Sequence, residues 1–259
     1  PIGAGILRQL ADVYRKVRNT SRYLLGNLHD FNPASDAIAV ADLPLLDRWM
    51  LQRTAEVMDE ITEAFESYEF FRFFQLLQNF CVTDLSNFYL DIAKDRLYVS
   101  APADRRRRSC QTVMALIIER LAGFIAPVLC HMAEDIWQNL PYPVQETSVF
   151  QRGWPTVPSA WRNDTLSAPM QQLRELRAAV NKVLEDCRGR QELGASLEAA
   201  VRIDSRSPEL QEALFWLNDN GDPDVDGLRD WLLVSPLQLG GEPWAEVLAS
   251  HEDDLALID

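Results

Sequence analysis

Little in this sequence can build a catalytic or metal site. The 259 residues include 11 glycines, three histidines and four cysteines. The glycines form no Gly-x-Gly-x-x-Gly motif, no Walker lysine loop and no Gly-x-Ser-x-Gly motif, which excludes the common phosphate loops and nucleophile turns. Cys130 and His131 are adjacent, so on a helix they face different directions and chelate one ion poorly. We therefore expect no catalytic residue, no metal and no cofactor within this chain.

Long apolar runs are also missing. No run approaches the roughly 18 to 20 residues that a membrane span needs, and the N-terminus lacks a basic segment followed by an apolar one. The cysteines Cys81, Cys110, Cys130 and Cys187 form no Cys-x-x-Cys pair, which is typical of reduced thiols. We expect a cytoplasmic monomer with no membrane partner. Since the first residue is Pro1 rather than Met, we expect the chain to be part of a longer one.

Basic side chains are fewer than acidic ones. The chain has 25 Lys and Arg against 39 Asp and Glu, a formal net charge of -14, which by itself disfavours nucleic-acid binding. Residues 1–160 hold 16 basic and 19 acidic side chains, whereas residues 161–259 hold 9 and 20. A chain with 47% apolar residues can bury a sizeable core, so disorder is excluded as its main state. Any nucleic acid should be held by the first part.

Apolar residues in the first part recur with the spacing of buried helix faces. The buried face of the first predicted helix consists of Ile6, Leu10, Val13, Val17, Leu24 and Leu28. The predicted helices span residues 6–28, 44–67, 70–92, 107–124 and 127–140, and an aromatic stripe makes the third the most strongly patterned. Short connections between them indicate an up-and-down bundle over residues 1–160, which includes an extended connector from 141 to 161.

The second part has a different pattern. A helix is predicted over 166–187, a strand over 196–204, a helix opened by Ser207 and Pro208, and one or two strands within 228–239. We interpret residues 161–259 as a small acidic α+β domain. The chain as a whole is then mainly α.

One acidic loop partly matches a metal motif. Residues 222–227 resemble the front of an EF-hand calcium loop, with Asp230 at its ninth position. The twelfth position holds Leu233, where a bidentate Glu is needed, and Pro223 would constrain the turn. We therefore interpret the segment as a solvated acidic loop.

Positive charge in the bundle is gathered in two places. Arg15, Arg18 and Arg22 lie on the face of the first predicted helix opposite its apolar face, and residues 105–108 are four arginines that open the fourth helix. Positive charge near a helix N-terminus is unfavourable by a few tenths to about 1 kcal/mol per charge, which a capping Asp104 would partly offset. Such a run either binds an external anion such as phosphate or forms surface ion pairs. The sequence leaves both possibilities open.

Several longer segments occur in a distinctive order. They are residues 16–28, 46–49, 68–70, 79–98, 107–112, 126–137, 148–150, 154–155, 173–182 and 196–199. Together they resemble the C-terminal anticodon-binding region of bacterial-type isoleucyl-tRNA synthetases, which are class I enzymes. The Arg-Asn-Thr-x-Arg-Tyr-Leu-Leu-Gly-Asn and Asp-Leu-Ser-x-Phe-Tyr runs point to the isoleucine enzyme rather than to its valyl, leucyl or methionyl relatives.

The resemblance implies recognition of tRNA-Ile, with GAU as the cognate anticodon. The chain lacks the His-Ile-Gly-His and Lys-Met-Ser-Lys-Ser signatures that hold ATP in class I synthetases, and family order would place both before Pro1. It also lacks the cysteine pairs of the zinc module found in many bacterial members. ATP and Mg²⁺ are thus implied only for the full enzyme, and this chain alone is not expected to be catalytic.

Contacts to the RNA backbone are expected from the basic side chains, since arginines position phosphates while aromatic and polar groups take splayed bases. The predicted set is Arg15, Arg18, Arg22, Lys94, Arg96, Arg105, Arg106, Arg107 and Arg108. Asn19 and Trp137 also match motif positions, but we expect structural roles for them, as a satisfied polar group and a core anchor. The rival interpretation is a non-catalytic helical scaffold or protein-interaction domain derived from a synthetase, whose acidic second part serves a basic partner.

Overall fold

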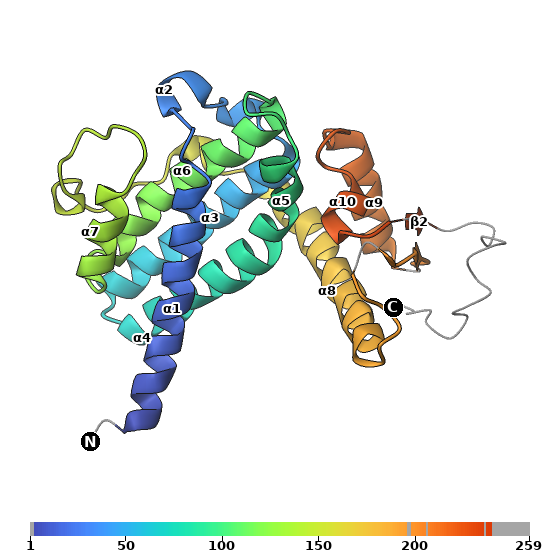
Figure 1. Cartoon of the computed structure of the whole chain (residues 1–259), viewed down its shortest axis with the longest axis horizontal. Coiled ribbons are helices and arrows are strands. Elements are labelled where there is room, and N and C mark those ends of the chain that lie inside the picture. Colours follow the sequence, from blue (N-terminus) through green and yellow to red (C-terminus); the bar gives the residue numbers. More distant parts are fainter. Residues whose placement is uncertain (1–2, 196–197, 206, 236, 240–259) are drawn as a thin grey trace. The chain divides into compact units, whose positions relative to one another are not determined.

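The chain divides into two compact units, Pro1–Asn163 and Asp164–Asp259. A computed structural model describes residues 3–195, 198–205, 207–235 and 237–239. The described residues are mainly α-helical, with one small two-stranded sheet, which confirms the predicted fold class (Figure 1). None of the described helices is both long enough and apolar enough to cross a lipid bilayer.

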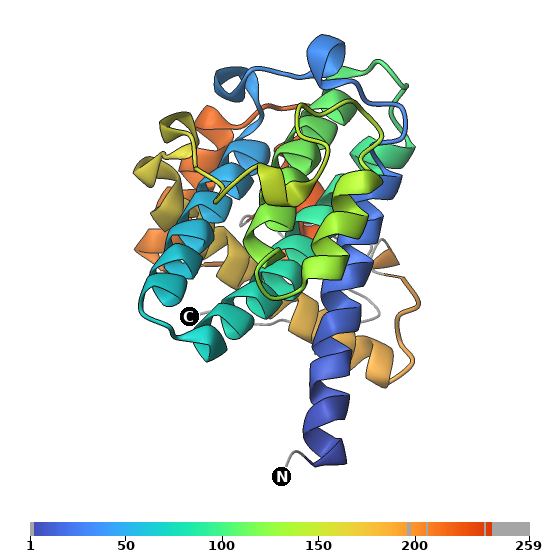
Figure 2. The ribbon, with the colours of Figure 1, turned by 90° about the vertical axis from the view of Figure 1, so that its left-hand side faces the viewer.

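Helices of different lengths make up most of the first unit (Figures 1 and 2). They are α1 (Ala4–Gly26), α2 (Pro33–Asp36), α3 (Leu45–Glu66), α4 (Phe70–Asn79), the π-helix η2 (Phe80–Tyr89), α5 (Leu90–Tyr98), α6 (Arg105–Ile125) and α7 (Cys130–Gln138). Because α4, η2 and α5 follow one another without a break, they act as one long element of the bundle. α3 packs against α4 and α6, and α1 packs against η2.

The aromatic stripe predicted over residues 70–92 supplies much of the bundle core. Its buried members are Phe73, Leu77, Phe80, Cys81, Leu85, Phe88, Tyr89 and Ile92. Phe88 meets Trp49 of α3 edge to face, with ring centroids 5.2 Å apart. Full burial of one such side chain is worth about 1.5–3 kcal/mol, so the stripe is a main source of this unit's stability. Phe70 at its start is 51% exposed and lies outside the core.

The stripe passes through the π-helix, whose backbone hydrogen bonds span five residues instead of four. Thr20 of α1 lies against this segment. Its hydroxyl is 3.3 Å from the Cys81 carbonyl oxygen, to which it donates, and 2.9 Å from the Ser86 hydroxyl. A polar contact between the helices therefore accompanies the apolar packing of α1 on η2.

The helix α1 begins before the bundle does. Ile6 and Leu10, which were predicted to be buried, are 52% and 45% exposed, whereas Val13, Val17 and Leu24 are buried. Figures 1 and 2 show the reason, since the first turns of α1 extend past the other helices of this unit. Helical periodicity predicts which side of a helix faces inward, but it does not predict where the neighbouring helices end.

The connector predicted over residues 141–161 packs on the bundle. The ring of Trp154 lies 5.1 Å from that of Phe65 and 4.9 Å from that of Phe124, measured between centroids. Pro155 covers Gly123 of α6 so closely that a Cβ on this glycine would lie 2.3 Å from Pro155 Cγ. The connector therefore packs on the bundle at Trp154 and Pro155 and adds the buried Val149 and Trp161 to the first unit's core, and α6 needs a glycine beneath Pro155.

The second unit contains α8 (Ser167–Gly189), β1 (Val201–Ile203), α9 (Pro208–Asn220), α10 (Leu228–Leu232) and β2 (Leu237–Leu239). The two strands are parallel, with Val201 opposite Leu237. As predicted, α9 opens with Ser207 as its cap, whose hydroxyl accepts the backbone N–H of Leu210. The core of this unit consists of Leu176, Val180, Leu184, Ile203, Leu210, Leu232 and Val234.

Two strand predictions in this unit need correction. The run 228–239 is mostly not a strand: it forms α10, which ends where Leu233 adopts a left-handed conformation with φ of 56°, and only then the short β2. A short apolar run does not separate buried strand from buried helix, which is why periodicity failed here. The strand predicted over 196–204 is observed at Val201–Ile203, and residues 196–197 lie outside the described residues.

Candidate nucleic-acid interface

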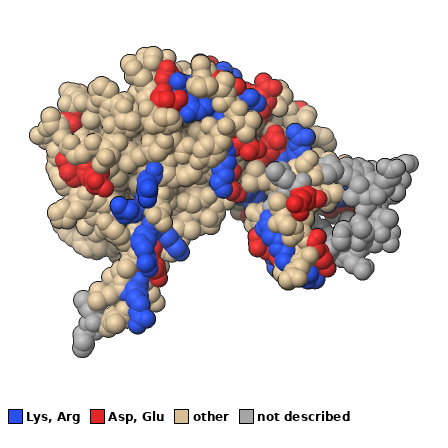
Figure 3. All heavy atoms as spheres, in the orientation of Figure 1, with Lys and Arg blue, Asp and Glu red and all other residues tan. Residues whose placement is uncertain are grey.

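Three arginines on the outer side of α1 form the first candidate site, which we call the α1 face. Arg15, Arg18 and Arg22 are exposed, on the side of the helix opposite the buried Val17. Arg15 pairs with Asp12, whereas Arg18 and Arg22 make no ion pair with the described residues. Figure 3 shows the resulting row of basic atoms along α1. Because four residues of helix rise about 6 Å, the row can contact consecutive points of an extended phosphate backbone.

The two predicted cations of α5 differ in exposure. Lys94 is exposed, and its Nζ lies 2.7 Å from Asp91 Oδ1. Arg96 is 7% exposed and donates to both carboxylate oxygens of Asp47 at 2.8 and 3.0 Å. The Tyr89 hydroxyl donates to the same carboxylate at 2.6 Å. Burial next to Asp47 raises the pKa of Tyr89, so this hydroxyl keeps its proton.

Arg96 therefore ties α5 to α3 inside the bundle. A buried guanidinium that already holds a carboxylate cannot reach an external phosphate. The RNA contact at Arg96 stays a prediction that this burial does not favour, while Lys94 has the exposure that such a contact requires.

The arginines that open α6 face two ways. Asp104 caps the helix, as predicted, by accepting the backbone N–H of Arg106 at 2.8 Å. Arg106 also pairs with the Asp104 carboxylate at 3.2 Å, and these hydrogen bonds lower the pKa of Asp104. Arg105 donates to the Asp42 carbonyl oxygen. Both arginines are exposed, so their contacts leave part of each guanidinium open to solvent.

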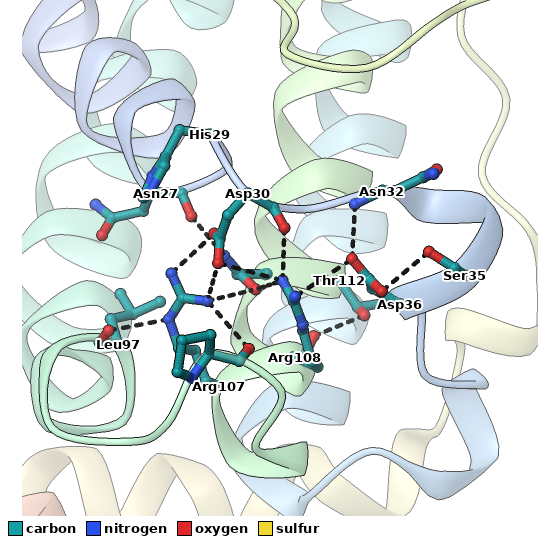
Figure 4. Close-up of polar contacts among 12 residues, drawn as sticks. Asn27, His29, Asp30, Asn32, Ser35, Asp36, Leu97, Arg107, Arg108 and Thr112 are labelled. Carbon is teal, nitrogen blue, oxygen red and sulfur yellow. Dashed lines mark hydrogen bonds and ion pairs between the residues drawn. The ribbon is translucent and has the colours of Figure 1, made fainter.

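Arg107 and Arg108 turn toward the protein (Figure 4). Arg107 is buried, holds the Asp30 carboxylate through bonds of 2.6 and 2.8 Å, and donates to the Leu97 carbonyl oxygen at 3.2 Å. Arg108 donates to the Asp30 carbonyl oxygen at 3.0 Å and lies 3.5 Å from Asp36. The Arg107 hydrogen bonds hold the pKa of Asp30 well below its usual range. Of the two possibilities left open by the sequence, ion pairing describes these two arginines, although the pairs are internal rather than at the surface. Their predicted RNA contacts stay a prediction that these internal partners do not favour.

Sequence reasoning missed two residues of this region. Asp30 organises the α6 arginines and also accepts a hydrogen bond of 2.8 Å from Gln111, but it lies 77 residues from Arg107 and no local signal marks it. Tyr98, at the end of α5, is 64% exposed. Its position four residues after Lys94, on the same helix face, is the signal that could have found it.

The two motif residues expected to be structural differ from each other. Trp137 is a core anchor as predicted: it is 2% exposed, and its indole N–H donates to the Glu146 carbonyl oxygen at 2.9 Å. Asn19 is exposed, and its structural role as a satisfied polar group stays a prediction. Its side chain belongs to the solvent side of α1, next to Arg18 in the chain.

Metal ligands do not gather in the described part of the chain, where no group of three or more His, Cys, Asp or Glu could hold an ion. In the loop 222–227, Asp226 is 3% exposed rather than solvated, which corrects that part of the prediction. Its carboxylate accepts the backbone N–H of Asp222 at 3.0 Å, and the Asp222 carboxylate accepts that of Asp224 at 3.0 Å. These carboxylates close the loop on its own backbone.

Comparison with known proteins places the chain in a family. A family model described as the anticodon-binding domain of tRNA ligase matches residues 47–203, more than half of the chain. The chain belongs to this family. Proteins named isoleucine–tRNA ligase are similar to this anticodon-binding domain over all 259 residues: the one from Parasynechococcus marenigrum (strain WH8102) is 94% identical, and those from Synechococcus sp. (strain CC9311) and Prochlorococcus marinus (strain MIT 9313) are each 77% identical.

Each of these matches covers 100% of the chain but 27% of the relative. The anticodon-binding chain thus spans about a quarter of the length of these curated relatives. The names do not favour the rival interpretation of a non-catalytic scaffold or protein-interaction domain.

Proposed function

We propose that this chain is the anticodon-binding region of an isoleucine–tRNA ligase and that it recognises tRNA-Ile. The observation that carries the proposal is the similarity over the whole chain to relatives of that name. The exposed cations of the bundle support it, because neutralisation of phosphates supplies most of the sequence-independent affinity for RNA.

Six exposed cations hold the RNA backbone in this proposal: Arg15, Arg18, Arg22, Lys94, Arg105 and Arg106. Hydrogen bonds from a guanidinium or ammonium to a phosphate oxygen are charge-assisted and fix the register of the RNA on the protein. Arg96, Arg107 and Arg108 are positioning residues, which hold α5 and α6 in place through Asp47 and Asp30. Specificity then comes from hydrogen bonds to the edges of splayed anticodon bases, while stacking of these bases on aromatic groups adds affinity.

The two parts of the chain have different roles in this proposal. The bundle with its connector, residues 1–160, carries only a small excess of negative charge, 16 basic against 19 acidic side chains, and holds the RNA. Residues 161–259, with 9 basic and 20 acidic side chains, form the acidic α+β junction and repel the phosphates. In the full protein, ATP and Mg²⁺ supply the chemistry that joins isoleucine to tRNA-Ile, at residues outside this chain.

Binding of two transcripts by the full-length protein tests the proposal. A tRNA-Ile transcript should bind more tightly than the same transcript with its anticodon exchanged, and both affinities should fall as salt rises. The double variant Arg18→Glu, Arg22→Glu should weaken both complexes. Lys182→Glu, which makes the same kind of change at an exposed position of α8, should leave both unchanged. Equal affinity for the two transcripts at moderate salt would contradict anticodon recognition.

A further inference from the structure

Tyr98 is an aromatic residue held open to solvent. It is the last residue of α5, its side chain is 64% exposed, and Val99 after it is 80% exposed. The Tyr98 hydroxyl donates to the hydroxyl of Tyr23, a partly buried residue of α1, at 3.2 Å. The hydroxyl end of the ring is therefore fixed, while most of the ring surface is exposed and contributes no hydrophobic stabilisation.

Two cations of the proposed RNA site lie within one helical turn of Tyr98 or of its partner Tyr23. Tyr23 directly follows Arg22, so the hydroxyl contact brings Tyr98 to the turn of α1 that carries the last arginine of the α1 face. Lys94 is one helical turn before Tyr98 on the same face of α5. An RNA strand that follows the α1 face toward Arg22 thus arrives at the exposed ring.

Two carboxylates on α5 decide which part of a nucleotide fits there. Asp91 is paired with Lys94 at 2.7 Å, and Asp95 is exposed. A phosphate at this point would be repelled by Asp95, whereas an uncharged base would not. The surroundings of Tyr98 therefore suit a base, with its phosphate on the arginine side of α1.

We propose that Tyr98 stacks on an unpaired base of the RNA whose backbone lies along the α1 face, and that Tyr23 holds the ring in position. This inference rests on the proposed function and names one aromatic group of that site. Every base has a π face, so stacking adds affinity without reading the sequence. Loss of the ring should weaken cognate and anticodon-exchanged RNA equally.

Phe71 offers a matched control elsewhere on the bundle. It is 74% exposed on α4, so it resembles Tyr98 in exposure. The neighbouring Arg72 is already paired with Glu63 at 2.8 Å and with Glu69 at 3.3 Å, which leaves the local charge negative. Tyr98 bonds to Tyr23, which follows the exposed Arg22, whereas the cation next to Phe71 is already paired with two carboxylates. The loss of the Phe71 ring should therefore not affect binding.

The test uses the full-length protein and a fluorescent RNA hairpin with the anticodon loop of tRNA-Ile, titrated at several salt concentrations. Tyr98→Leu should weaken binding about tenfold, the size of one lost stacking contact. Its dependence on salt should stay as in the wild type, because no phosphate contact is removed. Tyr98→Phe keeps the ring and should bind within about twofold of the wild type, and Phe71→Leu should bind like the wild type.

Four results would contradict the proposed stacking contact or replace it by another kind of contact. Wild-type affinity in Tyr98→Leu, with weaker binding in Arg18→Ala, would overturn the stacking contact and leave the proposed function standing. Wild-type affinity in both variants would overturn the two together. Equal losses in Tyr98→Phe and Tyr98→Leu would replace stacking by a hydroxyl contact, and a weaker salt dependence in Tyr98→Leu would replace it by an electrostatic one.

Discussion

The arginines of α1 and those at the start of α6 are similar in sequence and different in structure. Arg18 and Arg22 point to solvent and make no ion pair with the described residues, whereas Arg107 and Arg108 are held by Asp30. The difference comes from the acidic partner, which the fold brings to α6 from the turn after α1 (Figure 4). Acidic residues placed by tertiary structure thus decide which cations of this bundle remain exposed and unpaired among the described residues.

The largest loss of stability is expected from a change at Asp47. Asp47→Ala leaves Arg96 buried without its carboxylate, and removing one partner of a buried ion pair costs about 3–5 kcal/mol. Urea unfolding at neutral pH should show a loss of this size in the free energy of unfolding. The control is Asp91→Ala, which removes the partner of the exposed Lys94 and should cost less than about 1 kcal/mol. Equal losses in the two variants would contradict the assignment of Arg96 to the interior.

A smaller loss is expected at Asp30, whose carboxylate is only partly shielded from water. Asp30→Asn removes the charge that holds Arg107 and should lower the free energy of unfolding by about 2 kcal/mol, the range of a hydrogen bond to a charged group. Asp12→Asn removes the exposed partner of Arg15 and should have no measurable effect in the same urea titration. If Asp30→Asn were as stable as the wild type, the α6 arginines would contribute no more to stability through their ion pairs than the exposed arginines of α1.

Low pH should weaken the contact between Asp30 and Arg107, because protonation removes the charge of the carboxylate. The folded-state pKa of Asp30 is depressed, so its stabilising contribution is complete above the unfolded carboxyl pKa of about 3.9 and is lost as pH falls below that value toward the folded pKa. The stability difference between wild type and Asp30→Asn should therefore be constant near neutral pH and shrink below about pH 4. Urea midpoints of both proteins across this range measure the difference. A gap that persists unchanged in acid would show that the Asp30 charge contributes nothing.

The glycines of α1 and α6 extend the comparison to packing. Gly123→Ala in α6 would push a Cβ to 2.3 Å from Pro155 Cγ, and overpacking of this kind costs about 1–2 kcal/mol. Gly26→Ala, in the last turn of α1, meets no atom within 4 Å and should leave stability unchanged or raise it by less than about 1 kcal/mol. Thermal unfolding of the two variants compares them directly. A neutral Gly123→Ala would mean that the connector moves freely over α6.

The sequence predicts those features of the fold that depend on residues close together in the chain. The helices, the Asp104 and Ser207 caps and the buried aromatic stripe depend on residues within one or two turns, and all are found where the pattern indicates. The exposed Ile6 and Leu10 and the helix within 228–239 depend on where other elements lie. Neither fact is contained in the local spacing of apolar residues.

The same distinction applies to the site. Periodicity places Arg15, Arg18 and Arg22 on the outer side of α1, because the opposite side is apolar. Within the α6 run it cannot separate the exposed Arg106 from the buried Arg107, since successive helical residues differ only by about 100° and the deciding carboxylate lies far away in the chain. A charged run therefore predicts a cluster of contacts without saying whether the partner is internal or external.

The salt dependence of RNA binding is the most direct test of the difference between the two arginine groups. With the full-length protein and a tRNA-Ile transcript, the double variant Arg18→Ala, Arg22→Ala should lower the slope of log affinity against log salt by about 1.4, which is about 0.7 for each lost single-strand phosphate contact. Arg108→Ala should leave the slope unchanged, since that arginine is held by Asp30 and Asp36. An unchanged slope in the α1 variant, with a reduced one in Arg108→Ala, would contradict the account.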